Sequence, residues 1–151
     1  MKIRIRPAVA AGIIGTIVMT GVGLWIAPLM GIPAMNPARM MAGAMGGSLA
    51  LGWIAHFMIG TVLALIYAGV APALPGKPIV RGALYGIAPF LLAQMAVIPM
   101  MGMRVFSGSA TLAMGSLVGH LVYGGVVGGV YGAVPADAVV TSGGQPASAA
   151  R

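Results

Sequence analysis

The chain has 151 residues, of which 60% are hydrophobic and 6% are charged, and its mean hydropathy is +1.04. A soluble domain carries about 25% charged residues, so this composition excludes an ordinary water-soluble fold. The net charge of +7 comes from basic residues scattered at the ends of apolar segments, without the basic stripe that nucleic acid requires. Composition therefore predicts an all-α integral membrane protein that contacts the lipid bilayer and no nucleic acid.

Two residue types are missing from the apolar segments. The chain has no cysteine, which excludes disulfides, Cys-ligated zinc and iron–sulfur clusters. Its one acidic residue, Asp137, lies beyond the last apolar segment. No carboxylate is therefore available in the membrane for acid–base catalysis or proton relay, and we expect no enzymatic activity.

The chain begins with a basic segment that leads into an apolar run. Lys2, Arg4 and Arg6 precede a span that we predict over residues 8–30. The apolar core of a signal peptide has about 7–15 residues, so this run is too long to be one. We interpret it as the first of four membrane-spanning helices.

The first outer loop contains a helix signal. Asn36 followed by Pro37 is typical of an N-cap and first helical residue, and predicts a short interfacial helix as far as Met45. The second span is predicted over residues 48–70.

The second half of the chain contains two further apolar segments, over residues 82–101 and 111–134. Pro89 predicts a kink in the third span, because proline removes a helical hydrogen bond. The four spans form a single domain over residues 1–134. Residues 135–151, rich in Ala, Ser, Gly and Pro, are expected to form a disordered cytoplasmic tail.

The distribution of basic residues predicts the orientation. Three lie before the first span and two in the 71–81 turn, whereas the other loops have one each, Arg39 and Arg104. Basic loops stay on the cytoplasmic side, so both termini are expected there. Tyr67 and Tyr131 end their helices on that side and are predicted to anchor in the headgroups.

Two parts of the chain resemble each other. Residues 52–67 match residues 116–131, and PLMG at 28–31 matches PMMG at 99–102. This pattern predicts a duplicated two-helix hairpin. Two spans per unit place both units in the same orientation, with a pseudo-twofold axis along the membrane normal.

The segments HFMIGTVLALIYA, PMMG and VGHLVYGGVVGGVYG give the chain a resemblance to an uncharacterised family of small four-helix bacterial inner-membrane proteins. The resemblance extends over about residues 8–134. It implies the four-helix fold and a location in the bacterial inner (plasma) membrane. It implies no activity, since none is established for that family.

His56 and His120, the only histidines, are the candidate functional residues. Each is expected about 12–14 Å from the outer end of its span. Ionisable side chains at this depth in the membrane are rare and indicate a functional site. The matching segments predict that the imidazoles face each other at one depth. Small residues lie one turn before and after each histidine on the same helix face, namely Gly52, Gly60, Ser116 and Gly124.

Three interpretations of this pair stay open. It can be a structural hydrogen-bonded pair in a cofactor-free scaffold or complex subunit. It can bind haem b through two axial imidazoles, with Arg39 and Arg104 near the propionates, and this is the specific function we favour. Alternatively, thioethers at the outer side can bind Cu(I) together with the imidazoles. The methionines for this third interpretation are Met40, Met41, Met45, Met100 and Met101.

The last span also contains glycine pairs with helical spacing, which predict a close-packing face for a homodimer or a membrane-complex partner. These residues are Gly115, Gly119, Gly125 and Gly129.

Overall fold

The computed structural model describes residues 3–132. Four helical segments in this range are long and apolar enough to cross a membrane, and the described residues form no strand. These segments are Ile5–Leu29, Leu49–Ala73, Pro78–Met100 and Ala110–Tyr131. The predicted all-α membrane fold with four spans is therefore confirmed. The tail predicted over residues 135–151 lies outside the described residues.

The first and third spans contain a π-helical turn at matching places. The first consists of α1 (Ile5–Gly21), the π-helix η1 (Val22–Ile26) and α2 (Ala27–Leu29), and the third of α5 (Pro78–Leu92), the π-helix η3 (Ala93–Val97) and α6 (Ile98–Met100). Pro89 lies inside α5, which continues beyond it. The first span has its π-helical turn without an equivalent proline, so proline alone does not account for the change of pitch.

These two spans also end alike. Gly31 and Gly102 have φ angles of 76° and 82°, a left-handed conformation that favours glycine. Their N–H groups donate to the carbonyls of Pro28 (3.1 Å) and Pro99 (2.9 Å). Both ends thus use the same helix-terminating motif. The matched ends support the duplication, which itself stays a prediction.

The loops that follow the first and third spans contain short helices. α3 (Pro37–Ala44) begins where predicted, and the side-chain oxygen of Asn36 accepts a hydrogen bond from the Arg39 amide at 3.0 Å. The second span is α4 (Leu49–Val70) with a final 3₁₀ turn, η2 (Ala71–Ala73). A further 3₁₀ turn, η4 (Val105–Gly108), precedes the last span, α7 (Ala110–Tyr131).

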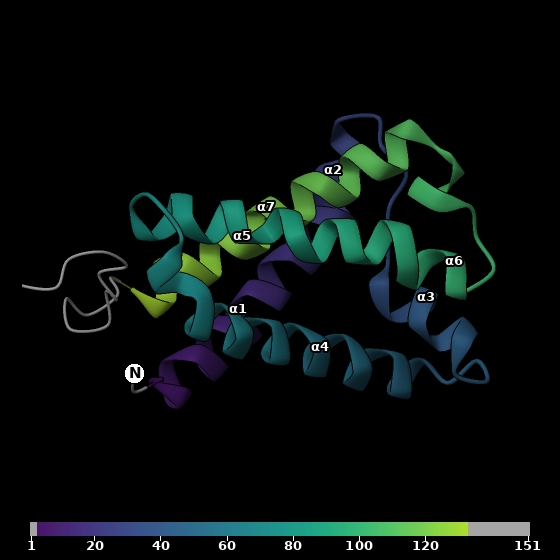
Figure 1. Cartoon of the computed structure of the whole chain (residues 1–151). Coiled ribbons are helices and arrows are strands. Elements are labelled where there is room, and N and C mark those ends of the chain that lie inside the picture. The colour runs from purple at the N-terminus through teal and green to yellow at the C-terminus, as the bar shows by residue number, and fades with distance from the viewer. Residues whose placement is uncertain (1–2, 133–151) are drawn as a thin grey trace, which may run out of the picture.

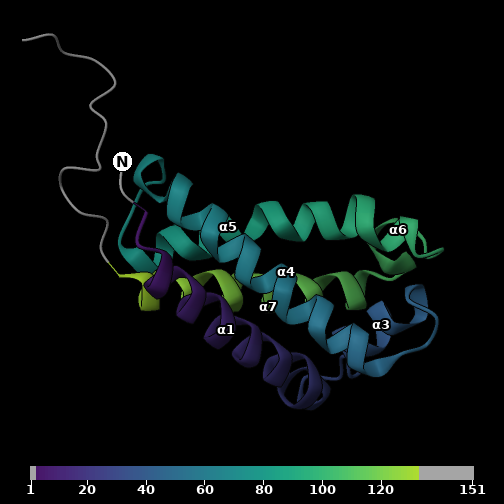
Figure 2. The same cartoon turned by 90° about the horizontal axis from the view of Figure 1, so that it is seen from below.

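The bundle is closed on three sides. α1 packs against both α4 and α7, α5 packs along α7, and α3 covers the N-terminal half of α4 (Figure 1). α4 and α5 make few contacts and separate toward the end that holds α3 and α6 (Figure 2). Glycines allow the close crossings, since a Cβ on Gly82 of α5 would lie 2.0 Å from the Gly124 carbonyl oxygen of α7.

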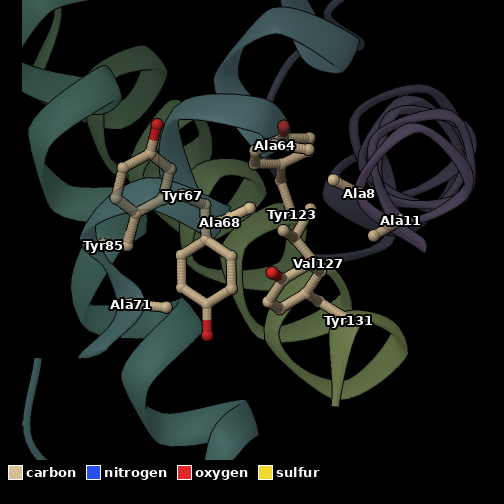
Figure 3. Close-up of a cluster of buried hydrophobic side chains, with 10 residues drawn as sticks. All are labelled: Ala8, Ala11, Ala64, Tyr67, Ala68, Ala71, Tyr85, Tyr123, Val127 and Tyr131. Atoms are coloured by element: carbon tan, nitrogen blue, oxygen red, sulfur yellow. The ribbon is translucent and has the colours of Figure 1, made fainter. Parts of the chain in front are cut away.

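The opposite end of the bundle is held by the four tyrosines of the chain (Figure 3): Tyr67, Tyr85, Tyr123 and Tyr131. The Tyr67 ring lies 5.3 Å from that of Tyr85 and 6.0 Å from that of Tyr131. Tyr67 is fully buried and Tyr131 is 5% exposed. The prediction that these two tyrosines anchor in the headgroups is therefore wrong, because they pack against each other inside the bundle.

The described ends of the chain meet beside this tyrosine cluster. Arg4 donates a hydrogen bond of 2.6 Å from Nη2 to the Tyr131 carbonyl, and its guanidinium carbon lies 4.8 Å from the centre of the Tyr131 ring. The first and last spans are thus joined at the end where α1 begins.

The glycine pairs of α7 pack within the chain. A Cβ on Gly115 would meet Ile32 and Met35, and one on Gly119 would meet Met19. Gly125 and Gly129 lie against Ile79 of α5. Gly115, Gly119 and Gly125 are therefore buried within the chain, whereas Gly129 is exposed. A homodimer or complex partner stays a prediction.

Candidate functional site

A cavity of about 210 Å³ lies between the helices, and both histidines line it. Its walls come from every span and from α3, and its inner floor includes Gly60, Leu63 and Tyr123. Two hydrogen bonds close this floor, from the Tyr123 hydroxyl to the Gly60 carbonyl and from the Tyr85 hydroxyl to the Leu63 carbonyl at 2.8 Å. The cavity thus ends above the tyrosine cluster.

His56 is tied to the first span. Its Nε2 lies 2.9 Å from the Thr20 hydroxyl oxygen, which lies 2.7 Å from the Thr16 carbonyl oxygen. A carbonyl only accepts, so the single hydroxyl hydrogen of Thr20 goes to Thr16. Nε2 of His56 must then carry a hydrogen and donate it to Thr20. In the neutral ring, the unprotonated nitrogen of His56 is Nδ1.

His120 has the opposite tautomer. Its Nδ1 lies 2.8 Å from the Ser116 carbonyl oxygen one turn earlier and 3.4 Å from the Ser116 hydroxyl. Because the carbonyl only accepts, Nδ1 carries the hydrogen. Among the described residues, no hydrogen bond reaches Nε2 of His120. This nitrogen keeps its lone pair free, in the arrangement that protein histidines use to bind metals.

Between residues 3 and 132, no hydrogen bond joins the two imidazoles directly. The interhelical bond of this region links His56 to Thr20 instead. The sequence offset that pairs Pro28 with Pro99 pairs Thr20 with Leu91. His120 therefore has no hydroxyl at the equivalent place. Sequence reasoning missed Thr20, although its position one turn after Thr16 within the first span could have indicated it.

Methionines form much of the cavity lining. Five of them contribute: Met19, Met35, Met40, Met41 and Met101. Met45 and Met100, which we predicted as ligands, do not line the cavity and are 42% and 86% exposed. Met19 and Met35 were not among the five methionines named as ligands, since only the packing of α1 and its following loop against α7 brings them there.

The glycines of α7 accommodate two of these thioether side chains. A Cβ on Gly115 would lie 2.7 Å from Cε of Met35, and one on Gly119 would lie 3.5 Å from Cγ of Met19. Both glycines line the cavity within two turns of His120. The space beside that histidine is thus taken by flexible methionines.

The other predicted residues divide into two groups. Gly60 and Ser116 line the cavity, and Thr16 packs against Gly60. Gly52 and Gly124 pack against neighbouring backbones outside it, where added Cβ atoms would lie 2.1 Å from the carbonyl oxygens of Ala38 and Gly82. Arg39 and Arg104 are exposed and also lie outside the cavity lining.

A strained loop contacts the cavity at its outer end. Ser107 and Phe106 of η4 have φ angles of 59° and 53°, which are uncommon for residues other than glycine. The Ser107 hydroxyl donates to Oε1 of Gln94 in η3 at 3.0 Å. Gln94 is 1% exposed, and its Nε2 has no hydrogen-bond partner among the described residues. Both Ser107 and Gln94 line the cavity.

The cavity reaches the lipid-facing side of the bundle between α4 and α5. Three of its lining residues are large, apolar and exposed, namely Ile59 (42%), Leu92 (58%) and Val97 (39%). They belong to the second and third spans, which separate at this level (Figure 2).

No curated protein and no solved structure matches the chain. The DUF6789 family, described as a family of unknown function, matches residues 3–140 and so includes all four spans. The resemblance to an uncharacterised family of small four-helix proteins is thereby confirmed. The chain, with its four membrane-spanning helices, therefore belongs to DUF6789, a family of unknown function.

Proposed function

We propose that the chain is a non-enzymatic membrane protein that binds Cu(I) in the cavity between its helices. The observation that carries this proposal is the composition of the cavity lining. Two histidines and five methionines contribute to it, and one imidazole nitrogen, Nε2 of His120, has a free lone pair.

The ligand chemistry favours a soft monovalent cation. Thioether sulfur and imidazole nitrogen are the neutral ligands that Cu(I) accepts readily. The described spans contain no carboxylate and the chain has no cysteine, so a divalent cation would meet no negative charge. An uncompensated charge in the membrane is costly, and a single positive charge costs less than two.

The methionines are placed where a cation from the outer end would meet them. Met40 and Met41 lie on α3 and Met101 follows α6, all toward the outer end of the cavity. Met19 and Met35 lie against Gly119 and Gly115 of the His120 helix. Methionine has three rotatable side-chain bonds, so these thioethers can rearrange around an ion without moving the backbone.

The first experiment measures Cu(I) binding to the full chain in lipid nanodiscs, without oxygen, in competition with a chromogenic Cu(I) chelator. We expect the parent to retain Cu(I). Replacement of three lining methionines by leucine (M40L, M41L and M101L together) should weaken binding by about tenfold or more, since Met-to-Leu conserves volume but removes the sulfur.

The chain offers a matched control for this triple variant. Met58, Met95 and Met114 lie in spans, are 59%, 60% and 56% exposed, and do not line the cavity. Their joint replacement by leucine should leave Cu(I) binding unchanged. The proposal is wrong if the parent competes no better than empty nanodiscs, or if both triple variants lose Cu(I) equally.

Haem b is the second candidate, because both histidines and four glycines line the same cavity. Three features rank it below Cu(I). Nε2 of His56 is already bonded to Thr20, and Arg39 and Arg104 lie outside the cavity lining. The cavity of about 210 Å³ is also smaller than the roughly 300–1,000 Å³ of ordinary ligand pockets. A Soret band in protein expressed with ample haem, lost on H120Q, would reverse this ranking.

A further inference from the structure

We infer that the two histidines, although they occupy matching places in the sequence, have different roles: His120 binds the cation through Nε2, and His56 is a positioning residue that joins α4 to α1. The inference rests on the proposed Cu(I) function for its ligand. The structural part of the inference is that the two imidazoles have different tautomers. This part depends only on their hydrogen bonds.

The difference lies in which ring nitrogen is free. Nε2 is the outer nitrogen of an imidazole, whereas Nδ1 lies beside the Cβ atom and close to the backbone of its own helix. His120 uses the inner nitrogen for its bond to Ser116 and leaves the outer one free. His56 uses the outer nitrogen for its bond to Thr20, so only its hindered inner nitrogen keeps a lone pair.

Ser116 also suits His120 to metal binding. The backbone carbonyl that accepts from Nδ1 fixes the tautomer and the ring orientation, and it makes Nε2 a stronger electron donor. The ring is held further by Phe90, whose centre lies 5.9 Å from that of His120 with the planes 68° apart. His120 is half-buried and lines the cavity, so its free nitrogen is accessible to an ion there.

His56 is placed for contact between helices. It is 6% exposed, and its outer nitrogen begins a chain of two hydrogen bonds that runs through Thr20 to the Thr16 carbonyl. To bind a cation through Nε2, His56 would have to break its bond to Thr20 and leave the Thr20 oxygen without its donor in an apolar environment. His120 can bind without breaking any hydrogen bond between described residues.

The decisive experiment is ¹⁵N NMR of the full chain labelled at its two histidines. Variants H56Q and H120Q assign the signals. We expect Nε2 to be protonated in His56 and Nδ1 in His120 without metal. Addition of Cu(I), which is diamagnetic, should shift the Nε2 resonance of His120 and leave both nitrogens of His56 unchanged.

Binding measurements give an independent readout. H120Q should weaken Cu(I) binding by about tenfold or more, and H56Q should change it by less than about threefold. A Cu(I) shift on His56, or equal losses in both variants, would overturn the inference. If the parent binds no Cu(I), the proposed function fails by itself. The metal-free spectrum still tests the structural part, and identical tautomers in both rings would overturn that part.

Discussion

The Thr20 hydroxyl determines the tautomer of His56. Thr20 has one hydrogen, which it gives to Thr16, and so it can only accept from the imidazole. Thr16 in turn bonds to the Gly12 carbonyl at 2.7 Å and packs against Gly60. The Thr20 hydroxyl, which donates to Thr16 and accepts from the imidazole, thus keeps the outer nitrogen of His56 protonated.

Replacement of Thr20 by valine keeps the side-chain shape and removes this hydroxyl. T20V should lower the free energy of unfolding by about 0.6 kcal/mol, the average for polar bonds between membrane helices, and by at most about 1.7 kcal/mol, because the His56 N–H then lacks an acceptor. Unfolding by titration with a denaturing detergent measures this change. T61V is the control, since the Thr61 hydroxyl bonds only to Phe57 of its own helix. Equal effects from both variants would remove the proposed helix-joining role of His56.

Glycine determines which helices come close. α5 and α7 cross where backbone atoms of Gly82, Gly86, Gly124 and Gly128 meet, and α3 crosses α4 at Gly52. Because small residues drive helix association in lipid, these crossings fix the frame of the bundle. The cavity then lies where α4 and α5 lack such a crossing.

Added methyl groups test this frame. In G82A, the new Cβ would lie 2.0 Å from a backbone oxygen that cannot rotate away, so we expect a loss of about 1–3 kcal/mol or more in stability. In G69A, the nearest atom is Cδ1 of Ile3 at 3.9 Å, so that variant should be neutral or slightly stabilising. The detergent titration compares them. A tolerated G82A would show that α5 and α7 are not held by this contact.

The molecule as a whole has two different ends. One end holds the tyrosine cluster and both described chain ends, joined by Arg4 and Tyr131. The other holds α3, η4 and the methionine side of the cavity (Figure 1). Sequence charge predicts that the tyrosine end is cytoplasmic, so a cation would reach the cavity from the outer side.

The absence of cysteine makes this orientation easy to test, because any introduced thiol is unique. A membrane-impermeant maleimide added to intact cells should label S107C, at the outer loop. It should label K77C, in the turn between α4 and α5, only after the membrane is opened. Labelling of K77C in intact cells, with S107C protected, would reverse the orientation.

The sequence predicted the four spans, the Asn36 cap and the histidine pair from local signals: apolar length, an Asn-Pro step and a repeated pattern. It could not predict which small residues pack and which line a cavity. Gly60 and Gly124 have the same spacing from a histidine, yet one lines the cavity and the other meets Gly82. Tyr67 is a tyrosine at the end of a span, which is typical of an interfacial anchor. It is buried only because α4, α5 and α7 converge around it.

Because α4 and α5 separate, the cavity is open toward the surrounding lipid. Ile59, Leu92 and Val97 border the cavity and are exposed, so in a bilayer we expect acyl chains to lie against this side of it. The same protein will therefore have a different interior in each medium, because the flexible tails of a short-chain detergent pack against this wall differently from ordered phospholipid tails. We therefore expect the proposed Cu(I) affinity to depend on membrane thickness and acyl-chain order. For this chain, we expect the host membrane to change the shape of the cavity as much as a substitution in its lining would.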